Sequence, residues 1–74
     1  MAIYMIGDLI TKSGLPRDTI NYYLREGLIQ PVDRSERNRY RYFDETTLEL
    51  LNKIIDLRRQ GVSIRQIRKQ LREE

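Results

Sequence analysis

Gly14 and Pro16, a glycine and a proline two residues apart, constrain the fold of this chain more than any other feature. Apolar residues before them recur at the spacing of one face of a short helix, at Ile6, Leu9 and Ile10. Gly14 would end this helix, because glycine suits the left-handed position that follows a helix. Pro16 would open the next helix, since the first helical residue needs no N–H donor. Two short helices joined by a tight turn predict a helix-turn-helix.

The second expected helix, residues 16–26, has an apolar and a polar face. The apolar face comprises Ile20, Tyr23, Leu24 and Gly27, and the polar face comprises Arg17, Asp18, Asn21, Tyr22 and Arg25. Adjacent helical residues cannot point the same way, so Tyr23 is expected in the core and Tyr22 on the polar face. The Tyr22 hydroxyl could there donate to a phosphate. Gly27 should end the helix, with Leu28 and Ile29 folding back beneath it.

The helical period disappears between Val32 and Phe43, where aromatic and β-branched residues flank a polar, turn-prone centre. This pattern predicts a short two-stranded hairpin, the wing, over residues 32–43. Within it three arginines alternate with an asparagine and two tyrosines, in the order Arg37, Asn38, Arg39, Tyr40, Arg41 and Tyr42. In extended chain the arginines would share one face, which suits phosphate binding or minor-groove insertion. Alternatively, they form a solvated edge that discourages strand pairing.

Two further helices are expected after the hairpin. Asp44 should cap a long helix whose apolar stripe comprises Leu48, Leu51, Ile54 and Ile55, joined by Leu50 and Leu57. Gly61 should end it, and a capping box from Ser63 to Gln66 should open a last helix with Ile64, Ile67 and Leu71 on one face. Residues 1–74 are thus expected to form one mainly α-helical domain, a winged helix-turn-helix of four short helices and a small two-stranded wing.

The composition favours a binding protein over an enzyme. The 74 residues include no cysteine and no histidine, which excludes disulfides and Cys/His metal sites, and no metal or cofactor is expected. There is no glycine-rich phosphate loop, and the carboxylates at Asp44, Glu45, Glu49 and Asp56 are spaced like exposed helix residues. The chain has no apolar run long enough to span a bilayer and no signal peptide, so a cytoplasmic location is expected.

Charge is segregated along the chain. Residues 12–41 contain seven basic and four acidic side chains, residues 42–57 one and four, and residues 58–74 six and two. Such segregation predicts a basic face, for which nucleic acid is the commonest partner. In the second helix, Arg17 and Asn21 have the chemistry to bind guanine and adenine edges in the major groove. The alternative for this helix is an ordinary solvated polar face. The cations of the last helix are expected to form a solvated face, or the start of something longer.

The chain resembles the DNA-binding domain of MerR-family transcriptional regulators over essentially its whole length. The resemblance is carried by the Ile-Gly-Asp-Leu start, the Thr-Ile-x-Tyr-Tyr helix followed by Glu-Gly-Leu, the Tyr-Arg-x-aromatic wing and the helix that ends in x-Gly-Val-Ser-Ile. It departs from the family at Asn21, where arginine is usual, and at Arg39, where glycine is common. It also departs at Pro16, the usual Ser/Thr capping place, and at Leu24, the usual acidic position.

The resemblance implies a second helix in the major groove and a wing, around Arg39 to Arg41, on the flanking backbone. The residues expected to contact DNA, from the pattern and the resemblance together, are Arg17, Thr19, Asn21, Tyr22, Arg25, Arg37, Arg39, Tyr40 and Arg41. The family binds pseudo-palindromic operators in double-stranded DNA as homodimers, through a long helix that follows the domain. A chain of 74 residues without that helix is expected to be mostly monomeric.

Two other functions remain open on the sequence. The same basic face could bind an acidic protein, because tyrosine and arginine are also favoured at protein interfaces. The chain could also be an architectural, excisionase-like DNA binder instead of a promoter regulator.

Overall fold

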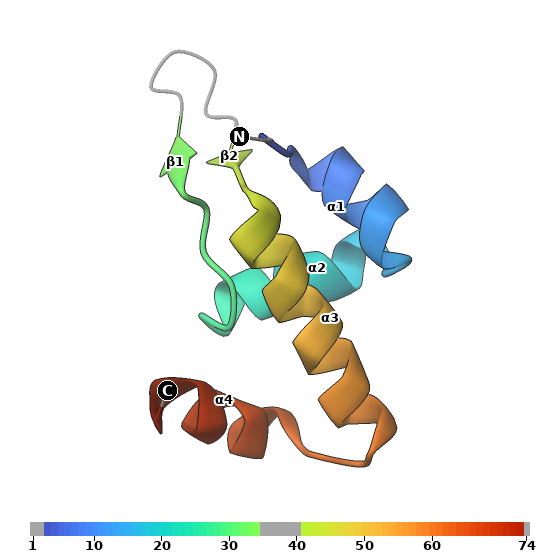
Figure 1. Cartoon of the computed structure of the whole chain (residues 1–74), viewed down its shortest axis with the longest axis vertical. Coiled ribbons are helices and arrows are strands. Elements are labelled where there is room, and N and C mark those ends of the chain that lie inside the picture. The colour runs from blue at the N-terminus through green and yellow to red at the C-terminus, as the bar shows by residue number, and fades with distance from the viewer. Residues whose placement is uncertain (1–2, 35–40, 74) are drawn as a thin grey trace.

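The computed structural model describes residues 3–34 and 41–73. Its elements are α1 (Ile6–Ser13), α2 (Arg17–Arg25), β1 (Asp33–Arg34), β2 (Arg41–Tyr42), α3 (Glu45–Arg59) and α4 (Ile64–Glu73). In Figure 1, α3 runs diagonally through the molecule, with the strands near its start and α4 across its far end. The expected mainly α-helical fold of four helices with a small two-stranded sheet is confirmed. No helix in the described part of the chain is long and apolar enough to cross a membrane.

The turn between α1 and α2 has the expected glycine, but the proline lies one position earlier relative to the helix than predicted. Gly14 is left-handed, with φ 78°, and its N–H donates to the carbonyl of Ile10 at 3.0 Å. Pro16 is the N-cap of α2, not its first helical residue, because its ψ of 154° is extended. The helix begins at Arg17, and the Pro16 carbonyl accepts its first bond, from Thr19 at 3.1 Å. The predicted helix 16–26 is therefore Arg17–Arg25.

The end of α2 is closed by a pair of backbone hydrogen bonds around Gly27. The Leu28 N–H donates to the Tyr23 carbonyl at 3.0 Å and the Gly27 N–H to the Leu24 carbonyl at 3.1 Å. This Schellman arrangement requires a left-handed residue, and Gly27 has φ 73°. Gly27 is exposed and lies beyond the helix, so its predicted place on the apolar face was wrong. Leu28 and Ile29 are buried beneath α2, as expected.

The base of the expected wing is a short antiparallel pair. Asp33 pairs with Tyr42 and Arg34 with Arg41, and the Val32 N–H donates to the Tyr42 carbonyl at 2.8 Å. The tip, residues 35–40, lies outside the described residues, and with it Arg37, Arg39 and Tyr40. The two-stranded prediction is thus confirmed at the base of the hairpin.

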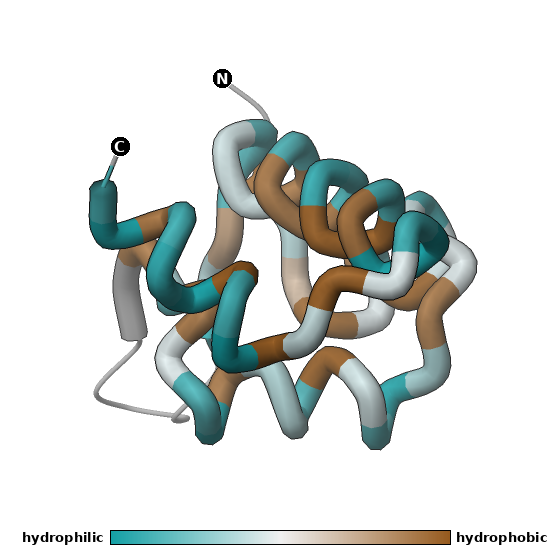
Figure 2. The backbone as a smooth tube through the Cα atoms, turned by 90° about the horizontal axis from the view of Figure 1, so that it is seen from below, coloured by the Kyte–Doolittle hydropathy of each residue, from teal (hydrophilic) through white to brown (hydrophobic). Residues whose placement is uncertain are grey.

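A single core joins all four helices. Its buried apolar side chains are Leu9, Ile20, Tyr23, Leu28, Ile29, Phe43, Leu51, Ile54 and Ile67. Figure 2 shows apolar and polar residues alternating around the turns of the helices. Each apolar stripe is therefore turned to one side of its helix.

The stripe of α3 differs from the predicted one on one edge. Leu51 and Ile54 are fully buried and Thr47 is 5% exposed, with Leu50 and Leu57 packed against the same cluster. The predicted Leu48 and Ile55 are half-buried and lie outside the cluster of described core residues, since they project from the opposite edge of the buried stripe.

The caps of the last two helices follow the sequence prediction. The Asp44 carboxylate accepts from the Thr47 N–H at 3.3 Å. The Ser63 hydroxyl accepts from the Gln66 N–H at 3.1 Å, as one half of the predicted capping box. These bonds fix where α3 and α4 begin, and thus where their side chains lie relative to α2.

Candidate nucleic-acid interface

Helix α2 turns its polar face away from the core. Arg17 and Arg25 are exposed, while Thr19 and Asn21 are half-buried. The two adjacent tyrosines are separated as predicted: Tyr23 is 6% exposed and Tyr22 36%. Their rings remain in contact, with centroids 5.9 Å apart at 52°. The buried ring of Tyr23 thus supports the outward-facing ring of Tyr22.

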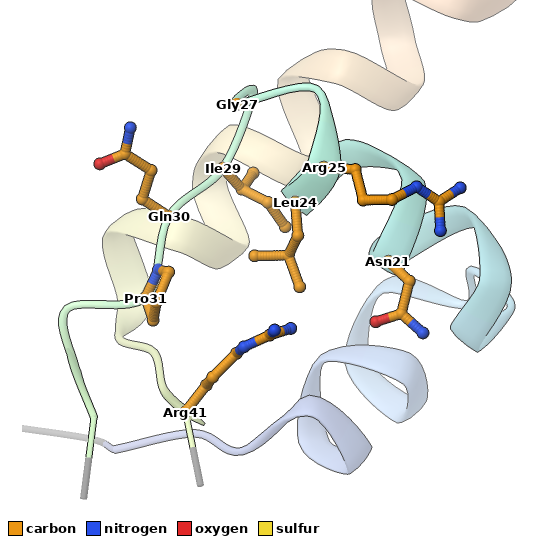
Figure 3. A pocket seen from close by; sticks show the side chains of 8 residues that line it. All are labelled: Asn21, Leu24, Arg25, Gly27, Ile29, Gln30, Pro31 and Arg41. Carbon is orange, nitrogen blue, oxygen red and sulfur yellow. The ribbon is translucent and has the colours of Figure 1, made fainter. Parts of the chain in front are cut away.

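A hollow of about 710 Å³, here called the wing-side hollow, lies between α2 and β2. Three of the predicted DNA-contacting residues line it, namely Asn21, Arg25 and Arg41. Figure 3 shows Arg41 extending from β2 into the hollow, toward Leu24 on α2. The structure therefore brings the wing arginine next to the helix that was predicted to read bases.

A second hollow of about 370 Å³, the α4-side hollow, lies on the other side of α2. It is lined by Asp18, Thr19, Tyr22, Tyr23, Arg58 and Ile64. Thr19 and Tyr22 thus face the junction of α3 and α4, while Asn21 and Arg25 face the wing. Arg17, at the first turn of α2, lines neither hollow.

The cations of α4 were expected to form a solvated face, and the structure places one of them, Arg68, beside α2. The Arg68 guanidinium forms an ion pair with the Glu26 carboxylate at 3.2 Å, which joins α4 to the end of α2. A surface hollow of about 530 Å³ runs along α4 and is lined by Ser63, Arg65, Gln66, Arg68, Lys69 and Arg72. The signal that could have identified this stripe is the helical spacing of its cations, opposite Ile64, Ile67 and Leu71.

Tyr4 positions the base of the wing, a role that the sequence analysis missed. Its backbone pairs with Phe43, through N–H to carbonyl bonds of 2.8 and 2.7 Å. Its hydroxyl donates to the Glu45 carboxylate at 2.6 Å, and the Lys12 ammonium lies 5.4 Å from the centre of its ring. The pKa of the Tyr4 hydroxyl is raised above 10.0, by the hydrogen bond to Glu45 and then by burial and the negative charges of Glu45 and Asp8. The strand that carries Arg41 is thus tied to α1 and α3.

No metal-binding cluster is present in residues 3–34 and 41–73, where no group of three His, Cys, Asp or Glu side chains converges. Two of the four helix carboxylates named above are used structurally: Asp44 caps α3 and Glu45 accepts from Tyr4. The arrangement presents donors and cations around one exposed helix, which is chemistry for binding an anionic partner.

Known proteins resemble the chain in both sequence and fold. Residues 4–74 match the MerR HTH family regulatory protein profile. The HTH-type transcriptional regulator CueR of Bacillus subtilis (strain 168) is 37% identical over 68 residues, which cover 92% of this chain and 46% of that protein. The mercuric resistance operon regulatory protein of Bacillus cereus is 35% identical, with 92% and 51% covered.

A solved structure has the same fold. HiNmlR, described as a MerR family regulator lacking the sensor domain and bound to promoter DNA, superposes with a TM-score of 0.81 at 28% identity. The match covers 92% of this chain and 51% of that one. The chain therefore spans about half the length of these relatives. With its helix-turn-helix, its wing and the match over residues 4–74, the chain belongs to the MerR HTH family of regulatory proteins.

Proposed function

We propose that residues 1–74 act as the sequence-specific DNA-binding domain of a transcriptional regulator, located in the cytoplasm. Helix α2 enters the major groove, with Asn21 at a base edge and Arg17 available for a second base or a phosphate. Thr19 and Tyr22 donate from the same helix to the sugar-phosphate backbone. The role of this chain is binding, with no catalytic step.

The wing and α4 hold the two phosphate strands on either side of α2. On the wing side, Arg41 and Arg25 supply the charge, and Arg37, Arg39 and Tyr40 of the tip extend the contact along the flank. On the other side, Arg58 lines the α4-side hollow and Arg68 pairs with Glu26, so both face the opposite strand, and Arg65 on α4 extends this contact. The observation that carries this proposal is the exposed polar face of α2, held between two cation-bearing flanks.

We further propose that two copies bind a pseudo-palindromic operator, while the 74-residue chain without DNA is a monomer. The promoter-bound relative supports the choice of partner, since its description names promoter DNA. Sedimentation of the free chain and its stoichiometry on operator DNA test this part of the proposal. A dimer in the absence of DNA would contradict it.

Fluorescence anisotropy of labelled DNA tests the function itself. The chain is titrated into its native upstream region and into random DNA of the same length, each at two salt concentrations. Tighter binding to the upstream region, with a steep loss of affinity as salt rises, is expected. Equal affinity for both DNAs would favour an architectural binder. No binding to either DNA at low salt would favour an acidic protein as the partner of the same face.

A further inference from the structure

The wing-side hollow contains cations but no carboxylate among the described residues that line it. Arg25 and Arg41 bring two positive charges, and Asn21 and Gln30 bring neutral amides. The remaining wall is apolar and comprises Leu24, Ile29 and Pro31 beside Gly27. Among the described residues that line the hollow, the positive charge is therefore uncompensated.

Arg41 is the cation that extends into this hollow, and Leu24 is the side chain toward which it points (Figure 3). Leu24 is half-buried and packs against the core, so its position is fixed by the fold. Arg41 is exposed and forms no ion pair with any described residue. In contrast, Arg68 on α4 already holds Glu26 at 3.2 Å.

We propose that Leu24 determines the DNA affinity of the wing, because its apolar side chain offers the Arg41 guanidinium no ion pair across the described part of the hollow and so leaves it available to a phosphate. A carboxylate at this position would be within reach of Arg41 and would pair with it in the free protein. DNA binding would then have to break that pair before the phosphate is bound. This inference rests on the proposed function, in which Arg41 contacts a phosphate.

The test compares Leu24→Glu with Leu24→Gln, two variants of similar shape that differ in charge. Both remove the same packing, and circular dichroism establishes that both fold. We expect Leu24→Glu to bind every DNA sequence about tenfold more weakly than Leu24→Gln. The slope of log affinity against log salt should also fall by about one unit. Equal affinities and slopes for the two variants would overturn the proposal.

Gln30→Glu is the control for the added negative charge. Gln30 lines the same hollow but points away from Arg41 (Figure 3). Gln30→Glu should weaken DNA binding less than the change from Leu24→Gln to Leu24→Glu does. On a logarithmic scale, we expect less than half of that loss. An equal loss would mean that the effect at position 24 comes from the added negative charge alone. It would overturn the proposed pairing of Arg41 with the introduced carboxylate.

A double substitution and a measurement without DNA separate this inference from the proposed function. Arg41→Ala should weaken binding of Leu24→Gln more than that of Leu24→Glu, because in Leu24→Glu the contact of Arg41 with the phosphate is already offset by the broken pair. In the free protein, the pKa of the carboxyl that Leu24→Glu introduces should lie below the usual value of about 4.3 for glutamate. An ordinary carboxyl pKa overturns the inference even if the native chain binds DNA. Failure of the native chain to bind DNA, with a lowered pKa, overturns the proposed function alone.

Discussion

The two sides of α2 both carry cations, but they differ in what surrounds those cations. On the wing side, Arg41 extends toward the apolar side chain of Leu24, with no carboxylate among the described lining residues. On the α4 side, Asp18 lines the hollow, Arg68 is paired with Glu26, and Arg58 donates to the Val62 carbonyl at 2.9 Å. A phosphate bound on the wing side would meet a guanidinium that has no ion pair with a described residue, whereas one on the α4 side would compete with existing bonds. We therefore expect DNA affinity to depend on how each cation is already paired, and not only on the number of cations.

The largest expected effect compares one arginine from each side. Arg41→Ala should weaken binding to all DNA sequences by about 1.5–3 kcal/mol, as expected for a lost charge-assisted contact. For Arg41→Ala, the slope of log affinity against log salt should also fall by about one unit. Arg68→Ala should cost clearly less, because Arg68 gives up Glu26 to reach DNA. Anisotropy titrations over a range of salt concentrations measure both, and equal losses would remove the asymmetry between the two sides.

A smaller effect, confined to one base pair, is expected from Asn21 at the rim of the wing-side hollow. Asn21→Ala should cost about 1–3 kcal/mol at a single operator position if the amide reads a base. Competition among operators that carry single base-pair changes identifies that position. Thr19→Ala, on the other side of α2, should weaken all of those operators alike. Uniform loss for Asn21→Ala would make Asn21 a backbone contact instead.

Breaking the ion pair between Arg68 and Glu26 should raise DNA affinity modestly, whereas the substitutions above lower it. Glu26→Gln removes the carboxylate that holds Arg68 and lowers the negative charge beside α2. We expect DNA affinity to rise a few-fold, with a steeper salt slope. The free energy of unfolding should change by no more than about 1 kcal/mol, since an ion pair between partly exposed side chains contributes little. Unchanged or weaker DNA binding would mean that Arg68 does not face the phosphates.

The smallest expected effect concerns the Tyr4 hydroxyl below the wing. Because its pKa in the folded chain is raised above 10.0, its contribution to stability is complete below pH 10 and is lost as pH rises through the raised value. Tyr4→Phe should therefore melt at a slightly lower temperature than the native chain at pH 8. The gap should close in strongly alkaline buffer, as thermal denaturation followed by circular dichroism can measure. A gap that widens with pH would contradict this sign.

The sequence predicts those features of the site that depend on nearby residues. The helix-turn-helix follows from Gly14 and from the apolar spacing on either side of it, and the opposite fates of Tyr22 and Tyr23 follow from helical geometry. The base of the hairpin follows from the loss of helical period after Val32. Each of these is a local pattern, so the surrounding fold has little opportunity to change it.

The features that the sequence does not predict arise from contacts between distant residues. Nothing local in Glu26 or Arg68 indicates that the two side chains meet, so the cations of α4 were assigned to a solvated face. Likewise, the pairing of Tyr4 with Phe43 joins residues far apart in the chain. On α3 the apolar residues flank both edges of the stripe, and only the packing decides that Leu48 and Ile55 stay outside the core.

The pairing of Tyr4 with Phe43 also has a consequence for how the domain opens. Residues that share backbone hydrogen bonds across two elements exchange their amide hydrogens only when those elements separate. The amides of Tyr4 and Phe43, which bond at 2.8 and 2.7 Å, should thus be protected from exchange by a similar factor. An opening of this pair would free the start of α1 and the strand that carries Arg41 in the same event.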